Sequence, residues 1–211
     1  MPGSQRNFAT KDSFLRVTEE AGMARSAAEK LWRELEARYS EPHRCYHNLD
    51  HLDQMLGVFS RLETGDRRGI ELAIWFHDVI YDPLSGENEA ASAEYFVQKF
   101  RDSCPWERIE TVRQLILATD HEKSVRESRE ADLLRDIDLS ILAAEEGSYE
   151  VYRRAIRKEY AAVPEAAFRK GRIALLEQLL SGTLFRSPEF ADFEARGRAN
   201  LRRELALWKE S

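Results

Sequence analysis

The residues of this chain best suited to chemistry are acidic and imidazole side chains set in apolar surroundings. His77 and Asp78 stand together inside the apolar run WFHDVIY, and Asp138 lies within LLRDIDLSIL. Burying an unpaired charge costs several kcal/mol, so such groups usually need a partner. A divalent metal would be such a partner, because imidazole nitrogens and carboxylate oxygens together suit Mn, Fe, Zn, Ni or Mg to differing degrees.

Three more histidines, His43, His47 and His51, fall within the segment EPHRCYHNLDH. The order His47, His77–Asp78, Asp138 draws its side chains from three separate helical segments, and the core of a helical bundle can bring such segments together around a metal. His51 follows His47 by four residues and either approaches the same site or simply helps to begin a helix. We expect His43, which follows a proline, to lie on the surface.

Helix signals recur along the whole chain, whereas strand signals hardly appear. Amphipathic spacing, capping residues and prolines predict helices over residues 12–22, 26–39, 48–63, 70–81, 89–100, 105–119, 130–146, 148–163, 164–182 and 187–210. The segment 70–81 is apolar nearly all round, which favours a central buried helix. We therefore expect an all-α bundle of roughly ten helices in one domain over residues 1–211, with a core at about 25–185.

Composition limits the functions to consider. The chain has 211 residues, 43% of them hydrophobic, and a formal net charge of −6. This acidity argues against non-specific nucleic-acid binding, which depends on Lys and Arg neutralising phosphates, but it permits a small phosphorylated substrate. Two cysteines, Cys45 and Cys104, form no close-spaced metal motif, and no apolar run approaches 18 residues. We expect a soluble, cytoplasmic protein.

Several motifs together resemble a known family. The order H…HD…D, with YHNLDHL, WFHDVIYD, NEAASA, DIDLSIL, IRKEY and EARGRANLRREL, resembles the HD superfamily of metal-dependent phosphohydrolases, in particular an uncharacterised branch of it. The resemblance spans nearly the whole chain. It implies an all-helical HD-type domain that hydrolyses a phosphomonoester or phosphoanhydride bond in a small molecule, expected to be a nucleotide.

The resemblance also implies roles for particular residues. His47, His77, Asp78 and Asp138 match the four ligands of one divalent metal ion. Members with two metals have further histidines between the HD pair and the last aspartate, and this chain has only His121 there. We therefore expect one tight metal, with His51 and His121 as candidates for a second, weaker ion or for side chains around the first.

Catalysis needs further groups near the metal. The candidates for general acid or base are Asp82, Glu89 and His121. Asp82 follows the HD pair by one helical turn, so we expect it on the same face as Asp78. The candidates for holding the phosphate are Arg44, Lys123, Arg154 and Arg157. HD enzymes that cleave guanosine tetraphosphate have an acidic pair where this chain has Tyr81 and Asp82, so activity on that alarmone is not implied.

Two other functions stay open at this point. The chain could be a metal-binding regulatory or interaction domain without turnover, or a di-iron oxygenase of HD type, which would require both His51 and His121 as ligands. Near the C-terminus, Arg196 and Asn200 lie four residues apart on one helix face. They could hydrogen-bond into the site or join helices, and the C-terminal helix could pack internally or in a homodimer.

Overall fold

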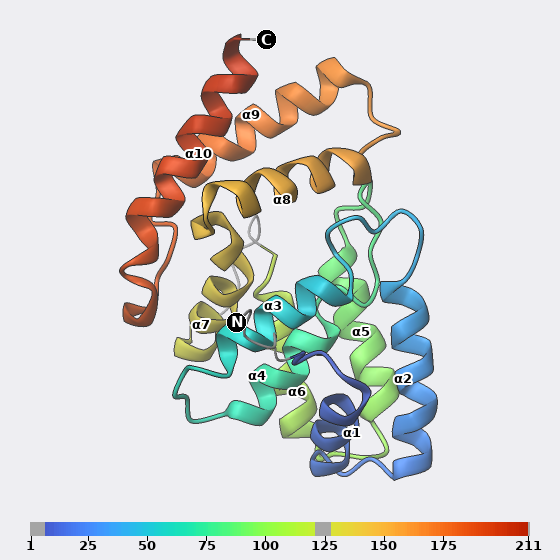
Figure 1. Cartoon of the computed structure of the whole chain (residues 1–211). Coiled ribbons are helices and arrows are strands. Elements are labelled where there is room, and N and C mark those ends of the chain that lie inside the picture. The colour runs from blue at the N-terminus through green and yellow to red at the C-terminus, as the bar shows by residue number, and fades with distance from the viewer. Residues whose placement is uncertain (1–6, 121–127, 211) are drawn as a thin grey trace, which may run out of the picture.

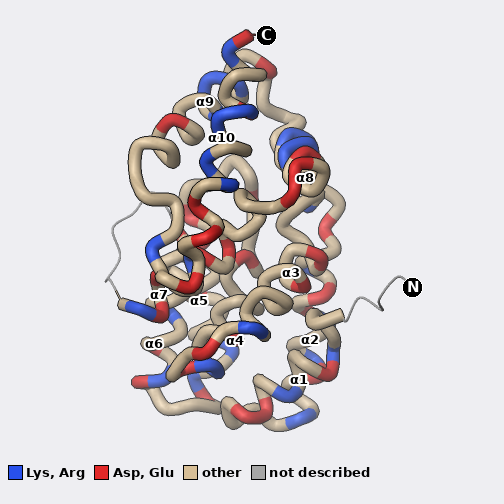
Figure 2. The backbone as a smooth tube through the Cα atoms, turned by 60° about the vertical axis from the view of Figure 1, so that its left-hand side comes forward, with Lys and Arg blue, Asp and Glu red and all other residues tan. Residues whose placement is uncertain are grey.

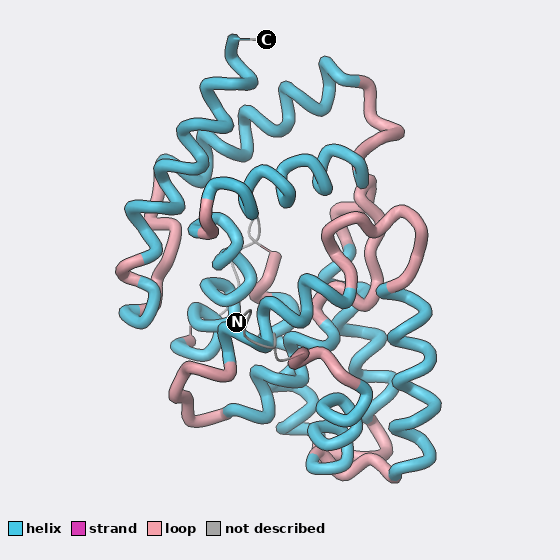
Figure 3. The backbone as a smooth tube through the Cα atoms, in the orientation of Figure 1, coloured by secondary structure: helices cyan, strands magenta, loops and turns pink. Residues whose placement is uncertain are grey.

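The computed structural model describes residues 7–120 and 128–210, and over these residues it contains helices and loops without strands (Figure 3). The all-α prediction is confirmed, with ten α-helices and two short 3-10 helices in the described parts of the chain. In order they are α1 (Lys11–Glu20), α2 (Arg25–Tyr39), α3 (Leu49–Phe59), α4 (Arg67–Phe76), α5 (Asn88–Phe100), α6 (Trp106–Leu117), α7 (Arg129–Asp138), η1 (Leu139–Ala143), α8 (Glu146–Glu159), α9 (Glu165–Ser181), η2 (Pro188–Phe190) and α10 (Phe193–Glu210).

Helix α4 lies at the centre of the molecule. It contacts α1, α3, α5, α6 and α7, and its residues from Leu72 to Phe76 are all fully buried. Figure 1 shows α1 to α6 gathered in one group and α8, α9 and α10 crossing beyond its end, with α7 leading from the first group to the second. One continuous cluster of buried apolar side chains runs from Phe14 to Trp208, so both groups of helices share it.

The central helix is shorter than its apolar pattern predicts. It ends at Phe76, His77 is its C-cap, and Asp78 begins a turn instead of continuing a helix to residue 81. Arg44 stabilises this turn from the side, because its guanidinium donates to the carbonyls of Asp78 at 2.7 Å and Val79 at 3.3 Å. The apolar pattern of the sequence cannot predict where the helix ends, because a buried turn requires the same apolar residues as a buried helix.

Two other helix ends also differ from the prediction. Helix α1, predicted over residues 12–22, spans Lys11–Glu20 and has Thr10 as its N-cap. The Thr10 hydroxyl accepts from the backbone N–H of Ser13, whose own hydroxyl accepts from Thr10 N–H. At the C-terminus, Ser187 and Pro188 open the short helix η2, and α10 begins only at Phe193. The single helix expected over 187–210 is therefore divided.

Helix α10 packs inside the molecule. It contacts α9 and η1, and the Asn200 side chain donates to the carbonyls of Leu142 and Ala144, both at 2.9 Å. Arg196 lies at the surface near Glu145, at 3.5 Å. Of the two roles open for this motif, joining helices is the one that Asn200 performs.

The surface carries both signs of charge. Figure 2 shows acidic and basic positions interspersed along the described helices. Among the described residues, no helix is both long enough and apolar enough to cross a membrane.

The start of α3 should be sensitive to its cap, Asn48, whose side chain accepts from the backbone N–H groups of Asp50 at 2.9 Å and His51 at 3.4 Å. Asn48→Ala should lower the free energy of unfolding by about 1 kcal/mol, since it leaves these donors without their acceptor. Urea denaturation measures this. Asn48→Ser keeps a capping oxygen and should lose less than half as much; equal losses in both variants would contradict the capping role.

Candidate metal centre

His77 and Asp78 lie at the point where α4 ends. Nδ1 of His77 donates to the carbonyl of Ile74 at 2.9 Å, which turns Nε2 toward the Asp78 carboxylate, 2.9 Å away from Oδ2. His77 is only 1% exposed. The helix end thus holds the imidazole in one orientation and one tautomer, as is usual for histidines that bind metals.

His51 approaches the pair from α3. Its Nε2 lies 3.3 Å from Nε2 of His77 and 3.2 Å from Oδ1 of Asp138. The side chain is buried, and burial lowers the pKa of His51. A neutral imidazole with a free lone pair is the form that binds metal ions.

Asp138 completes the group from the last residue of α7. Its Oδ1 is 3.8 Å from Nε2 of His77. The neighbouring acid, Asp136, faces elsewhere: it accepts from the backbone N–H groups of Arg186 at 2.9 Å and Ser187 at 2.6 Å. Asp136 therefore stabilises the loop before η2. Of these two acids, Asp138 is the one that belongs to the cluster with His51, His77 and Asp78.

The spacing of these donors fits a single metal ion. Ligand atoms of His51, His77 and Asp138 all lie within 4.8 Å of one another, and Asp78 Oδ2 lies 3.9 Å from Nε2 of His51. An ion bound at about 2.1 Å by each ligand sets neighbouring ligand atoms about 3.0–3.4 Å apart. The shortest separations, 2.9, 3.2 and 3.3 Å, fall in or beside this range.

The electrostatics of the cluster also favour a cation. Burial alone would lower the pKa of His77, but the charge and hydrogen bond of Asp78 raise it to about 9. Burial likewise opposes the ionised form of Asp78, yet His77 holds the pKa of that carboxyl well below its usual range. Positive charge is therefore stabilised at this point of the fold, whether a proton or a metal ion supplies it.

His47 lies beside the cluster and is held by Glu159, the last residue of α8. Oε2 of Glu159 accepts from His47 Nδ1 at 2.7 Å, and Oε1 accepts from the backbone N–H groups of Tyr46 and His47 at 2.7 and 2.9 Å. Burial would raise the pKa of Glu159, but its hydrogen bond with His47 lowers it to about 2. Because a carboxylate only accepts, Nδ1 carries the proton and Nε2 is the nitrogen left for a metal.

Tyr81 is held by the same carboxylate as His47. Its hydroxyl donates to Glu159 Oε2 at 2.8 Å, and its ring centroid lies 4.3 Å from that of His47. Glu159, the last residue of α8, therefore positions both side chains from the other group of helices.

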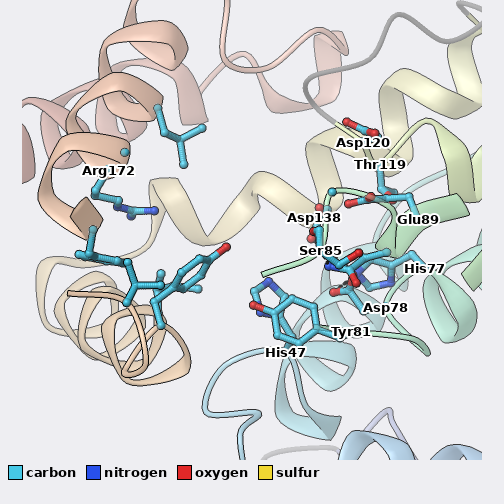
Figure 4. Close-up of a pocket in the computed structure, with 18 of the residues that line it drawn as sticks. His47, His77, Asp78, Tyr81, Ser85, Glu89, Thr119, Asp120, Asp138 and Arg172 are labelled. Atoms are coloured by element: carbon cyan, nitrogen blue, oxygen red, sulfur yellow. Dashed lines mark hydrogen bonds and ion pairs between the residues drawn. The ribbon is translucent and has the colours of Figure 1, made fainter. Parts of the chain in front are cut away.

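Three members of the donor cluster, His77, Asp78 and Asp138, line one end of a cavity of about 560 Å³, whereas His51 is buried and does not line it. Figure 4 shows His47, His77, Asp78 and Asp138 on one side, with Thr119, Asp120 and Glu89 above them and Arg172 on the opposite wall. Among the described lining residues there are four carboxylates, those of Asp78, Glu89, Asp120 and Asp138, and one guanidinium. The end of the cavity nearest the cluster is therefore strongly acidic.

The predicted acid–base residues have separate positions. Glu89, in the first turn of α5, lines the cavity. Asp82 is exposed, outside the lining, and its Oδ1 accepts from Leu84 N–H at 2.9 Å. It does not share a helix face with Asp78, because α4 ends at Phe76. His121 lies outside the described residues.

Three of the predicted phosphate-binding cations, Arg44, Arg154 and Arg157, do not line the cavity. Arg44 is buried against backbone carbonyls, including that of His47 at 3.2 Å. Arg154 pairs with Glu150 at the surface, and Arg157 bonds to Glu165 and to the carbonyl of Tyr160. All three are therefore structural, whereas Lys123 lies outside the described residues.

Reasoning from the sequence missed Glu159 and Arg172. Glu159 belongs to the motif IRKEY, but it is more than 100 residues from His47 in the chain. Arg172 lies within an ordinary helical pattern. The acidic residue in IRKEY was the one signal in the sequence for Glu159, and it does not indicate that His47 is the residue that Glu159 contacts.

Comparisons of this chain with protein-family models, with curated proteins and with solved structures find no significant match. The resemblance to the HD superfamily therefore stays a prediction from the motifs. The geometry supports a coarser statement: His51, His77 and Asp138 form a group that could hold a metal ion.

Metal binding should depend on His51 and not on His43, the exposed histidine whose Nε2 contacts the carbonyl of Tyr81. We expect His51→Ala to weaken metal binding at least about tenfold, because it removes one ligand of the group. Competition with a chromophoric chelator measures the affinity. His43→Ala is the matched control and should bind like the wild type; equal affinity in all three proteins would exclude His51 as a ligand.

Replacing Glu159 should disturb His47. In Glu159→Gln, an amide nitrogen can face the donors of His47 and Tyr81, so we expect unfolding to require about 1–3 kcal/mol less free energy. Urea denaturation measures the loss, and the NMR signal of the His47 Nδ1 proton should shift or disappear. The control Glu165→Gln, at the exposed start of α9, should change stability by less than about 0.5 kcal/mol. An unchanged Nδ1 signal would contradict the assigned hydrogen bond.

Proposed function

We propose that this chain is a metal-dependent phosphohydrolase of HD type that cleaves a phosphomonoester or phosphoanhydride bond in a small molecule. The observation that supports this most is the convergence of His51, His77, Asp78 and Asp138, whose imidazole Nε2 atoms lie 2.9–3.9 Å from the carboxylate oxygens. Three of the four, His77, Asp78 and Asp138, line a cavity. A cavity of about 560 Å³ is in the range used for small ligands.

In this proposal one divalent metal is held by His51, His77, Asp78 and Asp138, with Nε2 of His47 available as a further ligand. Such an ion supplies a bound water of lowered pKa and neutralises phosphate oxygens. The identity of the metal, among Mn, Fe, Zn, Ni and Mg, follows from elemental analysis of the purified protein.

The chain's own residues would orient the site and move protons. The rings of His77 and His47 are fixed because their Nδ1–H groups donate to the Ile74 carbonyl and the Glu159 carboxylate, so the metal-binding side chains need little rearrangement when a substrate binds. Glu89 lines the cavity and is our choice for the carboxyl group that exchanges a proton with water or the leaving group.

The charge of the cavity suits this reaction only with a cation present. Among the described residues, four carboxylates line it, against one guanidinium on the far wall and the two imidazoles of His47 and His77, so a phosphate at the metal end would meet more acidic than basic groups. A metal next to Asp78 and Asp138 would reverse that local field. Substrate binding should consequently be as metal-dependent as turnover.

A second candidate function is a di-iron oxygenase of HD type. It is favoured by one observation, the place of His51 among the donors. It also requires His121, which lies outside the described residues. Two equivalents of iron per chain, in place of one metal, would move the assignment to this function.

The first test is elemental analysis of protein purified without added metal, followed by a phosphatase screen. We expect about one equivalent of metal, hydrolysis of at least one phosphate ester or nucleotide, and loss of both in a folded His77→Ala/Asp78→Ala variant. Full metal occupancy without turnover across a broad panel would favour a regulatory metal-binding domain. Absence of metal after incubation with all five ions would refute the hydrolase.

The same screen tests the acid–base residue. Glu89→Gln should lower kcat about 100-fold, the usual effect of losing a proton-transfer group. The matched control is Asp82→Asn, which keeps the acceptor for Leu84 N–H outside the cavity and should stay within threefold of the wild type.

A further inference from the structure

Arg172 lies on the wall of the cavity opposite the donor cluster. It belongs to α9 and is only 7% exposed. Among the described residues that line the cavity it is the one Lys or Arg. Figure 4 shows its guanidinium turned toward the interior of the cavity, facing the side on which Asp138 and His47 lie.

A buried network holds Arg172 in this position. Its Nε and Nη2 donate to the two carboxylate oxygens of Glu204 at 2.8 and 3.0 Å. Glu204 is 1% exposed and also accepts from the Tyr149 hydroxyl at 2.5 Å and from Trp208 Nε1 at 3.0 Å. The planar guanidinium is thus fixed before any ligand arrives, which reduces the entropy lost on binding.

The pairing with Glu204 uses one edge of the guanidinium. Nη2 also approaches the Tyr152 hydroxyl at 3.4 Å, whereas Nη1 makes no hydrogen bond to any residue in the described ranges 7–120 and 128–210. Nη1 has two N–H donors. In a wall that is otherwise largely apolar, these donors are placed to meet an acceptor on a ligand.

The wall near Arg172 differs in character from the metal end. It is formed by apolar and aromatic residues of α8 and α9 and of the loop between them, among them Tyr152, Ile156, Tyr160, Phe168 and Leu175. The cavity therefore has an acidic end that suits a metal and phosphate, an apolar middle, and a single fixed cation. A ligand that fills the cavity would therefore have a phosphate at one end, an apolar middle and an anionic group that meets Arg172.

We propose that Arg172 selects the part of the substrate remote from the scissile phosphate, by binding an anionic oxygen group carried on an apolar, preferably aromatic, body. This inference rests on the proposed phosphohydrolase function and adds the class of substrate. The phosphate binds at the metal, the apolar body lies against α8 and α9, and a carboxylate or similar group contacts Nη1 of Arg172. A hydrogen bond between charged groups in such a place contributes about 10- to 100-fold in affinity.

Two kinds of phosphonate that cannot be hydrolysed test the inference. Calorimetry on the metal-loaded protein compares benzylphosphonate with 4-(phosphonomethyl)benzoate, and with its homologue that has one more methylene before the carboxylate. We expect at least one carboxylated ligand to bind about tenfold or more tightly than benzylphosphonate. Equal affinities for all three would overturn the role of Arg172 and leave the proposed function standing.

Variants test whether Arg172 is the cause of the preference for the carboxylated ligand. Arg172→Met/Glu204→Gln removes the cation without leaving a buried charge, and the amide oxygen introduced at position 204 can still accept from Tyr149 or Trp208. We expect this protein to bind benzylphosphonate within threefold of the wild type and to lose the preference for the carboxylate. Retention of the preference would overturn the inference. If the double variant does not fold, Arg172→Lys, which keeps the charge but not the fork, should lower the preference at least threefold.

One control completes the design. Arg154→Met removes an exposed arginine of α8 that lies outside the cavity lining; it should keep the preference, and loss of the preference in this variant would overturn the assignment. Failure of every phosphonate to bind the metal-loaded wild type would count against the phosphohydrolase itself and thereby against this inference.

Discussion

The imidazole Nε2 atoms of His51 and His77 lie 2.9–3.9 Å from carboxylate oxygens of Asp78 and Asp138, largely out of contact with water. Such a concentration of ionisable groups is unfavourable unless a cation shares it, because each buried charge loses its hydration. Several contacts of the surrounding structure hold these side chains in place. The end of α4 orients His77, Asn48 begins the helix that contains His51, and Arg44 holds the turn that contains Asp78.

The helices from α8 onward complete the site instead of merely covering it. Glu159 reaches from the end of α8 to three groups, the ring of His47, the backbone beside it and the hydroxyl of Tyr81. Farther along, Glu204 of α10 fixes Arg172 of α9 at the other end of the cavity. Asn200 attaches α10 to the carbonyls that follow α7, the helix of Asp138. The two ends of the cavity are thus linked through buried hydrogen bonds.

Where prediction from the sequence succeeded, the controlling interactions are local. The helix predicted from residue 48 and the all-helical class depend on residues a few positions apart, and the structure agrees with both. The errors have one kind of cause. The end of α4 at Phe76, the structural role of Arg44 and the surface position of Asp82 depend on contacts between distant segments. An apolar pattern looks the same whether a buried segment is a helix or a turn.

The sequence by itself determined the helical elements and the residue types able to bind a metal, because periodicity, capping and ligand chemistry are properties of short segments. Only the tertiary structure decided that His51 joins His77 and Asp138, that Asp136 serves a loop, and that Glu159 supports His47. It also decided that Arg172, and not Arg44, Arg154 or Arg157, faces the cavity. The positions of these residues depend on which helix faces pack together. That packing is determined by burial and charge pairing across the whole fold, and not by any short segment of the sequence.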